Sequence, residues 1–275
     1  MRYLITGAQG YLGKQLFNYM KSNYKNVYGT GRHEDKDIIP CNLLDINSVR
    51  NLINSVNPDL IVHCASIVPK KLIDYNDFKM QTHNCDILNN LLGVFKEKFI
   101  YISSMAVYGE TTNLPVKEND KKSPSSAYGL NKLKCENILM SSNLDSLSIR
   151  IPGLYGLPRR NGLVYNYIRS CKYNKKPTLI SEKLVWAGIY IEDVIESIQK
   201  AIELNLRGFE TINIAYNERY SINGLIEIVN DIYGLDFNYE INHPVFEFNL
   251  DKAKRLNLLS KNNFKDSLLK FCEKI

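Results

Sequence analysis

The sequence lacks the features that mark several classes of protein. No apolar run reaches the roughly 18 residues that a membrane-spanning helix needs. The apolar stretch at the N-terminus is short and meets Gly7 at once, so a signal peptide is not predicted. The net charge is only +6, and no block of like charge resembles a nucleic-acid-binding tail. These absences predict a soluble, cytoplasmic protein that binds neither membranes nor nucleic acid.

Recognised cysteine patterns are absent, since the cysteines are scattered along the chain. The six cysteines include no Cys-x-x-Cys pair, so a disulfide framework is not predicted. His63-Cys64 and His83-x-Cys85 bring histidine close to cysteine, but neither has the spacing of zinc ligands. We therefore expect reduced thiols and no bound metal.

The first half of the chain does contain a regular alternation of short apolar runs and longer amphipathic segments. Strands are predicted at residues 3–6, 26–30, 60–63, 99–103 and 147–151, with helices at 12–21, 46–55, 74–96 and 128–141. Strand–helix repetition predicts an α/β fold with a doubly wound parallel sheet of the Rossmann type, covered by helices on both faces.

Beyond about Pro152 the pattern becomes irregular, because glycine and proline interrupt it. Helices are predicted at residues 192–203, 221–233, 251–256 and 265–271, with a strand at 211–215. We predict a dinucleotide-binding Rossmann domain over residues 1–152 and a smaller substrate-binding lobe over 153–275. Some elements of the lobe are expected to return to the Rossmann core.

A glycine-rich loop joins the first predicted strand to the first predicted helix, with the sequence Thr6-Gly7-Ala8-Gln9-Gly10-Tyr11-Leu12-Gly13. Glycine permits a tight turn and lets backbone amides approach a pyrophosphate, which the positive end of the helix also attracts. A plain tight turn is the alternative. We assign the binding of a dinucleotide to Gly7, Gln9, Gly10, Tyr11, Leu12 and Gly13.

The end of the second predicted strand bears on the choice of nicotinamide cofactor. An acidic residue there holds the ribose 2′-hydroxyl of NAD, whereas an arginine accommodates the 2′-phosphate of NADP. This strand ends in Gly31-Arg32-His33, and the first acids, Glu34 and Asp35, come later. Arg32 therefore favours NADP(H), with NAD(H) still possible. Alternatively, Arg32 only begins a solvated loop of mixed charge.

Two further segments carry groups that can move protons. Tyr128 and Lys132 are four residues apart at a predicted helix start, which puts both side chains on one helix face. A nearby cation favours the phenolate of a tyrosine. The pair Ser103-Ser104 ends the preceding strand, at the edge where α/β sheets bind ligands. A serine hydroxyl there can hydrogen-bond a substrate carbonyl, which points to a catalytic group.

Together these segments resemble the extended short-chain dehydrogenase/reductase family, in its NAD-dependent epimerase/dehydratase branch. The resemblance covers nearly the whole chain and extends to Asn42-Leu43, His63-Cys64-Ala65-Ser66, Asn84, Val107-Tyr108-Gly109, Arg150–Gly156 and Tyr190–Val194. It implies that Ser104, Tyr128 and Lys132 are the catalytic residues. It also implies cofactor contacts from Asn42, Leu43, Cys64, Ala65, Ser66, Asn84, Tyr128, Lys132 and Ile151, and a homodimer through the helices after Asn84 and Tyr128.

The family includes 4-epimerases, 4,6-dehydratases, decarboxylases and 4-keto reductases of nucleotide sugars. Its dehydratases carry Asp-Glu directly after the catalytic serine or threonine, where this chain has Met105-Ala106. Neither side chain can move a proton, so dehydration is not expected. Because Arg32 favours NADPH, we expect a reductase of a 4-keto or 4-keto-6-deoxy nucleotide sugar. The alternatives are a 4-epimerase with bound NAD and a non-catalytic NADP-binding sensor.

The predicted substrate contacts depart from the family. Gly153 stands where the family has an asparagine, and Trp186 where it has an arginine that grips a diphosphate. An indole can stack on a base or sugar but cannot neutralise phosphate; Trp186 could equally pack within the lobe. Arg159, Arg160 or Arg219 could supply the charge or lie in solvent. Our substrate assignments are Ser104, Met105, Gly153, Arg159 and Trp186.

Overall fold

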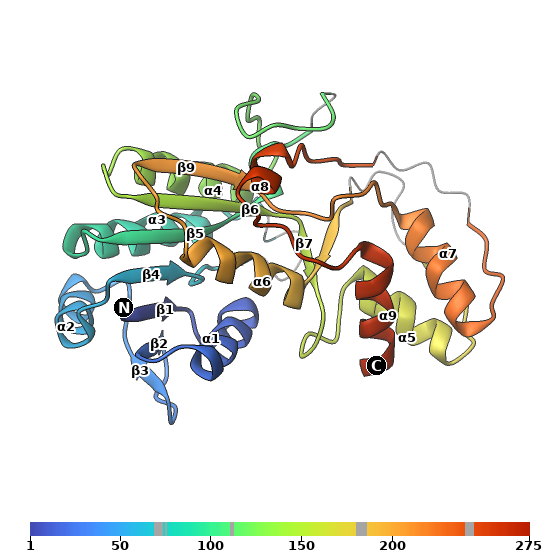
Figure 1. The fold of residues 1–275 in the computed structure, drawn as a ribbon, viewed down its shortest axis with the longest axis horizontal. Helices are drawn as coiled ribbons and strands as arrows, with labels where there is room; N and C mark the ends of the chain where they lie inside the picture. Colours follow the sequence, from blue (N-terminus) through green and yellow to red (C-terminus); the bar gives the residue numbers. More distant parts are fainter. Residues whose placement is uncertain (69–73, 75, 111–112, 180–185, 240–244) are drawn as a thin grey trace. The chain divides into compact units, whose positions relative to one another are not determined.

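The computed structural model describes residues 1–275 except 69–73, 75, 111–112, 180–185 and 240–244 (Figure 1). The chain divides into two compact units. The first contains Met1–Thr111, Asn119–Arg150 and Ile202–Ile212, and the second contains Thr112–Glu118, Ile151–Ala201 and Asn213–Ile275. Residues 202–212 thus return to the first unit after the chain has formed part of the second.

A seven-stranded sheet is the frame of the first unit, with the order β3-β2-β1-β4-β5-β6-β9. The strands are β1 (Tyr3–Thr6), β2 (Val27–Gly31), β3 (Ile38–Pro40), β4 (Leu60–His63), β5 (Lys98–Ser104), β6 (Ser146–Ile151) and β9 (Phe209–Asn213). The pairings of β1 with β2 and β4, of β2 with β3, and of β4 with β5 are parallel. The predicted α/β Rossmann fold is confirmed.

Helices connect β1 to β2, β3 to β4, β4 to β5 and β5 to β6, the usual link between parallel strands, whereas β2 and β3 are joined by residues 32–37 without a helix. The connecting helices are α1 (Tyr11–Asn23), α2 (Ile46–Val56), α3 (Phe78–Val94) and α4 (Ala127–Met140), with the short 3-10 helix η2 (Met105–Val107) after β5. Asp45 begins α2 by accepting hydrogen bonds from the amides of Asn47 and Ser48, and Ser126 begins α4 by accepting one from Gly129. A polar capping residue in the sequence therefore marks the start of α2 and of α4.

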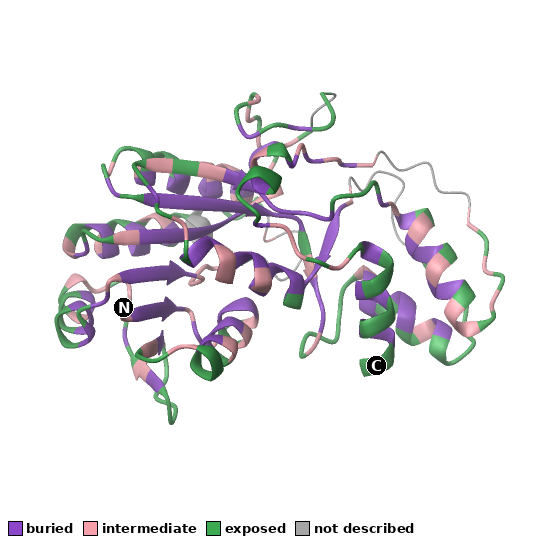
Figure 2. Cartoon of the chain, in the orientation of Figure 1, coloured by how far each residue is buried: buried purple, intermediate pink, exposed green. Residues whose placement is uncertain are grey.

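The core of the first unit explains why its central strands are uniformly apolar. Every residue of β1 and β4 is buried, because helices cover the sheet on both faces (Figure 2). Leu4, Ile61 and Phe99 lie in one cluster with side chains of α2, α3 and α4. This core fixes the sheet whose carboxyl edge carries the predicted site.

The second unit contains a two-stranded parallel sheet and several helices. The strands are β7 (Gly153–Tyr155) and β8 (Gly188–Tyr190), and the helices are α5 (Leu163–Lys172), α6 (Ile191–Ile202), α7 (Ile222–Tyr233), α8 (Asp251–Arg255) and α9 (Phe264–Lys274).

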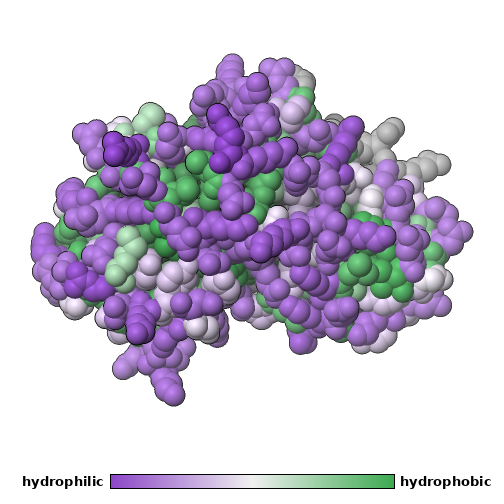
Figure 3. Space-filling view, viewed as in Figure 1, coloured by the Kyte–Doolittle hydropathy of each residue, from purple (hydrophilic) through white to green (hydrophobic). Residues whose placement is uncertain are grey.

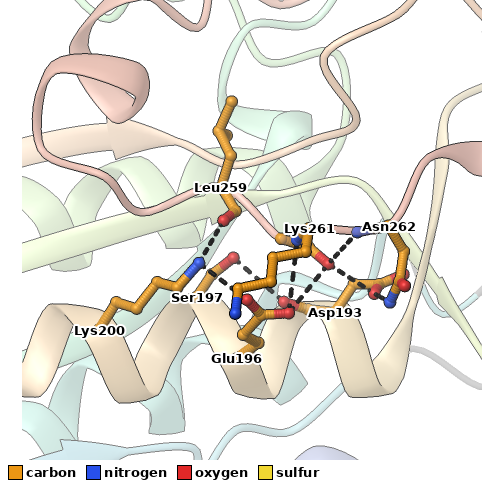
Figure 4. A network of polar contacts seen from close by, with 8 residues as sticks. Asp193, Glu196, Ser197, Lys200, Leu259, Lys261 and Asn262 are labelled. Carbon is orange, nitrogen blue, oxygen red and sulfur yellow. Dashed lines mark hydrogen bonds and ion pairs between the residues drawn. The ribbon is translucent and has the colours of Figure 1, made fainter.

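A buried carboxylate at the start of α6 holds this unit together. Asp193, 1% exposed, accepts hydrogen bonds from Ser260 (2.7 Å) and Asn262 (2.6 Å) through Oδ1, and from Tyr216 (2.9 Å) and Ser267 (2.5 Å) through Oδ2. Figure 4 shows the part of this network that joins α6 to residues 259–262. These four donors are all neutral, and they supply the hydrogen bonds that a buried carboxylate requires.

Most predicted elements are confirmed, with ends shifted by one or two residues. The helix predicted over 74–96 is wrong at its start, since α3 begins at Phe78; residue 75 lies outside the described residues. Asn84 lies inside α3. The prediction missed α5 and the three-residue strands β3, β7 and β8. A strand of three residues is too short to show the alternation of apolar and polar side chains that marks a strand in a sequence.

Within the described ranges, no helix has the length and apolar character that crossing a bilayer requires. Hydrophilic residues cover most of the face shown in Figure 3.

Candidate functional site

Gly7 and Gly13 of the glycine loop are packed so tightly that neither position has room for a side chain. Gly7 has a φ of +69°, and a Cβ there would lie 2.7 Å from the Ala65 backbone. A Cβ on Gly13 would lie 2.2 Å from the carbonyl oxygen of Gly7. Glycine is thus required at both positions, so that the loop can turn between β1 and α1 and lie against the end of β4.

The first turn of α1 differs from that of α2 and α4. Its N-cap is Gly10, and no side chain among the described residues caps the helix, whereas Asp45 and Ser126 cap the other two. The first amides of a helix have no acceptor within the helix, and they attract anions together with the helix dipole. The loop before α1 therefore fits a pyrophosphate, which would meet the first helical amides, those of Tyr11, Leu12 and Gly13. The Gly10 amide instead donates to the Gly7 carbonyl at 2.8 Å.

Gln9 shapes the region where the second strand ends. Its Nε2 donates to the His33 carbonyl at 2.8 Å, and its Oε1 accepts from the His33 amide at 3.2 Å. A Cβ on Gly31 would lie 2.3 Å from Gln9 Oε1, so glycine leaves room for this bracket. Arg32 lies between Gly31 and His33 and is exposed. The two hydrogen bonds of Gln9 thus hold the backbone at His33, directly after Arg32, next to the glycine loop.

The end of β4 lies beside the same loop. Thr6 Oγ1 shares a 2.7 Å hydrogen bond with His63 Nδ1 and accepts from the Ala65 amide at 3.4 Å. Burial lowers the pKa of His63 to about 3, so its imidazole is neutral. Cys64, Ala65 and Ser66 are partly buried, and Ser66 Oγ is a buried oxygen without a hydrogen-bond partner in the described part of the chain.

Three predicted cofactor residues make hydrogen bonds within the protein. Asn84 is 3% exposed; its side chain accepts from the Ile67 amide at 2.7 Å and donates to the Ile67 carbonyl at 3.2 Å, which fixes the loop after β4. Asn42 is exposed, and its Oδ1 accepts from the Leu44 amide at 3.2 Å. Leu43 is partly buried, and its carbonyl accepts from Asn90 at 3.0 Å.

The structure separates the roles of the two adjacent serines at the end of β5. Ser103 is 2% exposed and donates to Glu136 Oε1 at 2.6 Å, so its hydroxyl serves the core. Ser104 is half-buried, and its Oγ accepts from the Ala106 amide at 3.2 Å, which caps η2. This bond leaves the Ser104 proton available to a substrate oxygen. Met105 follows within η2 and is also half-buried.

Tyr128 and Lys132 lie on one face of α4, next to η2. Their proximity to η2 depends on Gly129, where a Cβ would lie 2.3 Å from the Ala106 carbonyl oxygen. Lys132 is 3% exposed, donates to the Ile102 carbonyl at 2.8 Å and lies 5.8 Å from the centre of the Tyr128 ring. Tyr128 itself is half-buried. The ammonium and the phenol are thus brought together where β5 ends.

Burial also tunes the lysine. It lowers the pKa of Lys132 to about 8, since the charged form loses its hydration. The Nζ lies 4.8 Å from the centre of the Tyr101 ring, whose π-face stabilises the cation. Lys132 therefore carries its charge at neutral pH and begins to lose it just above.

A buried ion pair behind the site was not predicted from the sequence. Arg150 Nη2 lies 2.7 Å from Glu136 Oε2, and both side chains are 2–3% exposed. Arg150 Nη1 also donates to the Tyr108 hydroxyl at 2.8 Å. Glu136 lies on α4 four residues after Lys132, Tyr108 follows η2, and Arg150 is on β6, so the pair ties together the elements that carry Ser104, Tyr128 and Lys132.

The remaining predicted residues belong to the second unit. Ile151 is buried at the end of β6, Gly153 is exposed in β7, and its amide donates to the Ala187 carbonyl at 3.0 Å. Arg159 is exposed and donates to Asn161 Oδ1 at 2.7 Å. Trp186 is partly buried, with its ring centre 6.0 Å from those of Tyr220 and Phe264. The indole thus packs in an aromatic cluster, as one of the two interpretations expected.

Comparison with known proteins points to one family. Residues 3–215 match the model of the NAD dependent epimerase/dehydratase family. Methionine adenosyltransferase 2 subunit beta of Bos taurus is 35% identical over 162 residues, which are 56% of this chain and 47% of that protein. The chain therefore spans about half the length of such curated relatives. The uncharacterized UDP-glucose epimerase YtcB of Bacillus subtilis is 28% identical over 267 residues, 85% of this chain and 83% of that protein.

Solved structures share the fold. UDP-glucuronic acid 4-epimerase from Bacillus cereus, in complex with UDP-glucuronic acid and NAD, superposes with a TM-score of 0.83 at 23% identity, covering 99% of this chain and 98% of that one. UDP-glucose 4-epimerase from Thermotoga maritima, with UDP-glucose, gives a TM-score of 0.82 at 19% identity, covering 99% and 98%.

Proposed function

Because the chain belongs to the NAD-dependent epimerase/dehydratase family, we propose that it is a nucleotide-sugar 4-epimerase that acts through Ser104, Tyr128 and Lys132. The observation that carries the proposal is the meeting of a half-buried phenol, a buried ammonium and a half-buried serine hydroxyl at the end of β5. All three lie in the unit that contains the glycine loop.

Each of these residues has a distinct task in the proposed reaction. When bound, the nicotinamide would accept a hydride from the sugar and return it. Tyr128 takes the proton of the sugar hydroxyl at its phenolic oxygen and later gives it back. Lys132 stabilises the phenolate by its charge and is suited to hold the cofactor ribose. Ser104 donates a hydrogen bond to the sugar oxygen while it is a carbonyl.

The family resemblance left two reactions open, and the comparisons support the epimerase better than the reductase favoured by the sequence. YtcB, named a UDP-glucose epimerase, matches along most of this chain. The structures that share its fold include UDP-sugar 4-epimerases, some bound to NAD. We accordingly propose a UDP-sugar as the substrate class and retained NAD(H) as the cofactor. A homodimer through α3 and α4 stays a prediction.

An NADPH-dependent 4-keto reductase is the second candidate, and one observation favours it. Arg32 is exposed at the end of β2, on a backbone that Gln9 holds beside the glycine loop. A guanidinium there suits a 2′-phosphate. The two candidates use the same catalytic residues and differ in whether the cofactor is consumed.

The experiment that tests the proposal follows sugar and cofactor together. Purified protein is incubated with UDP-sugars, and separately with 4-keto nucleotide sugars, in the presence of NAD or NADPH. Interconversion of two 4-epimers without net change in nicotinamide absorbance is expected. Stoichiometric NADPH oxidation with a keto sugar would instead support the reductase.

A Tyr128→Phe variant tests the assignment of the acid. Turnover should fall by about 10²–10⁴-fold, because general acid–base catalysis contributes that much. Dinucleotide affinity should change little, since the phenyl ring keeps the shape of the site. Full turnover in the variant would contradict the mechanism.

A further inference from the structure

Two cysteines from neighbouring helices meet behind the proposed catalytic residues. Cys85 on α3 and Cys135 on α4 have their sulfur atoms 3.8 Å apart. Cys85 is partly exposed and Cys135 is fully buried, and neither belongs to a disulfide. A disulfide has a sulfur–sulfur distance of about 2.05 Å, so the two sulfur atoms need to approach each other by less than about 2 Å to form one.

The surroundings of Cys85 favour its thiolate. Asn131 Nδ2 donates to Cys85 Sγ at 3.1 Å. The hydrogen bond from the Cys135 thiol lowers the pKa of Cys85 to about 7, with help from the charge of Lys134 and the amide of Asn131. The same contact and burial raise the pKa of Cys135. The Cys85 sulfur is thus prepared to attack an oxidant. Cys135 qualifies as its resolving partner by position, since its sulfur lies 3.8 Å away.

No other cysteine of the chain shares these properties. Burial raises the pKa of Cys41 to about 11, of Cys64 to about 12 and of Cys272 to about 11, and it also raises that of Cys171. These thiols stay protonated at neutral pH, and the thiolate is the reactive form. They are therefore suitable internal controls.

We propose that Cys85 and Cys135 form a site of reversible oxidation, at which a peroxide converts the two thiols into an intrachain disulfide between α3 and α4. The Cys85 thiolate attacks the peroxide, the O–O bond breaks, and a sulfenic acid forms as hydroxide leaves. The Cys135 sulfur then attacks the Cys85 sulfur, the S–O bond breaks, and the departing hydroxide takes the Cys135 proton as water. Both sulfurs are oxidised and the peroxide is reduced to water.

The position of Cys135 links this site to the proposed active site. Tyr128, Lys132 and Cys135 follow one another at helical spacings of four and three residues, so they lie on one stripe of α4. Drawing Cys135 toward α3 shifts the helix that holds the phenol and the ammonium. This consequence rests on the proposed function. A displacement on the order of 1 Å can cost about 10²-fold in rate, so we expect oxidation to lower turnover about 10- to 100-fold.

Peptide mapping of the full-length protein tests the disulfide without any assay of activity. The protein is treated with hydrogen peroxide, free thiols are alkylated, and a tryptic digest is analysed without reduction. A linked pair of peptides covering residues 80–96 and 135–150 is expected, and a thiol reductant should remove it. Cys171→Ser should leave the link intact, whereas Cys85→Ser should abolish it. Alkylation of both cysteines after treatment, or a link between two chains on a non-reducing gel, would overturn the proposal.

Turnover measured on the same samples tests the effect on α4. The oxidised wild-type protein should lose activity and regain it with a reductant, and Cys85→Ser should be insensitive to peroxide. A linked peptide with unchanged turnover would overturn the influence on catalysis. If no nucleotide sugar is converted in any state, the proposed function fails, but the peptide map still decides whether the disulfide forms.

Discussion

The buried Glu136–Arg150 pair gives the most quantitative prediction. Glu136 Oε1 accepts from Ser103, Ser148 and Arg150 at 2.6, 3.0 and 3.0 Å, while Oε2 accepts from Arg150 at 2.7 Å. Glu136→Gln keeps the shape of the side chain but removes the charge. It also replaces an accepting oxygen by an amide that has to face a donor.

The expected cost is large, because Arg150 would stay buried without its counter-charge. Removing one partner of a buried ion pair costs about 3–5 kcal/mol, against a typical total stability of about 5–15 kcal/mol. Since urea lowers stability by about 1–3 kcal/mol per molar, the midpoint should fall by at least about 1 M. Urea unfolding followed by far-ultraviolet circular dichroism measures this shift.

Two further variants make the test of the ion pair sharper. Glu97→Gln removes an exposed carboxylate from the same unit and should change stability by less than about 0.5 kcal/mol. Glu136→Leu combined with Arg150→Met should recover much of the loss, since apolar replacement of both partners is often neutral. A loss below about 1 kcal/mol in Glu136→Gln would refute the reasoning, because the pair would then not be desolvated in solution.

Three other predictions concern the site itself. Ser104→Ala should lower turnover about 10²-fold or more and cost about 1 kcal/mol of stability through the lost cap of η2. Its matched neighbour Ser103→Ala should lower the urea midpoint and leave turnover much less changed, and equal effects of the two variants on turnover would contradict the separation of roles. Arg32→Asp should weaken NADPH binding more than NADH binding in fluorescence titrations, and equal weakening would remove the argument for a 2′-phosphate contact. Lys132 is protonated below its pKa of about 8 and neutral above it, so turnover should fall as the pH rises through that value, and Lys132→Met should be slow with no such limb in its pH–rate profile.

The fold was largely predictable because its central strands obey a local rule. β1 and β4 are buried on both faces, so they appear in the sequence as continuous apolar runs, and the capping residues Asp45 and Ser126 mark where helices begin. β7 and β8 were missed because they are three residues long and contain or adjoin glycine. Their pairing joins segments far apart in the chain, which no local pattern records.

In the candidate site, too, some features could be predicted from the sequence and others could not. Gly7, Gly13, Tyr128 and Lys132 could be predicted because their spacing within one segment carries the chemistry. Two features could not be predicted: the hydrogen bonds of Gln9 at the end of β2, and the division of tasks between Ser103 and Ser104. Each depends on which side chain from another segment lies opposite, and that partner is set by tertiary packing.

The position of β9 has a consequence for fragments of the protein and for its folding during synthesis. β9 lies at the edge of the sheet beside β6, yet it follows the whole of residues 151–201 in the chain. A fragment cut near residue 152 would leave β6, every residue of which is buried in the full protein, as an open edge with unpaired backbone groups. Such a fragment is expected to aggregate. On the ribosome, likewise, the Rossmann sheet cannot be completed until the polypeptide has been synthesised past residue 213.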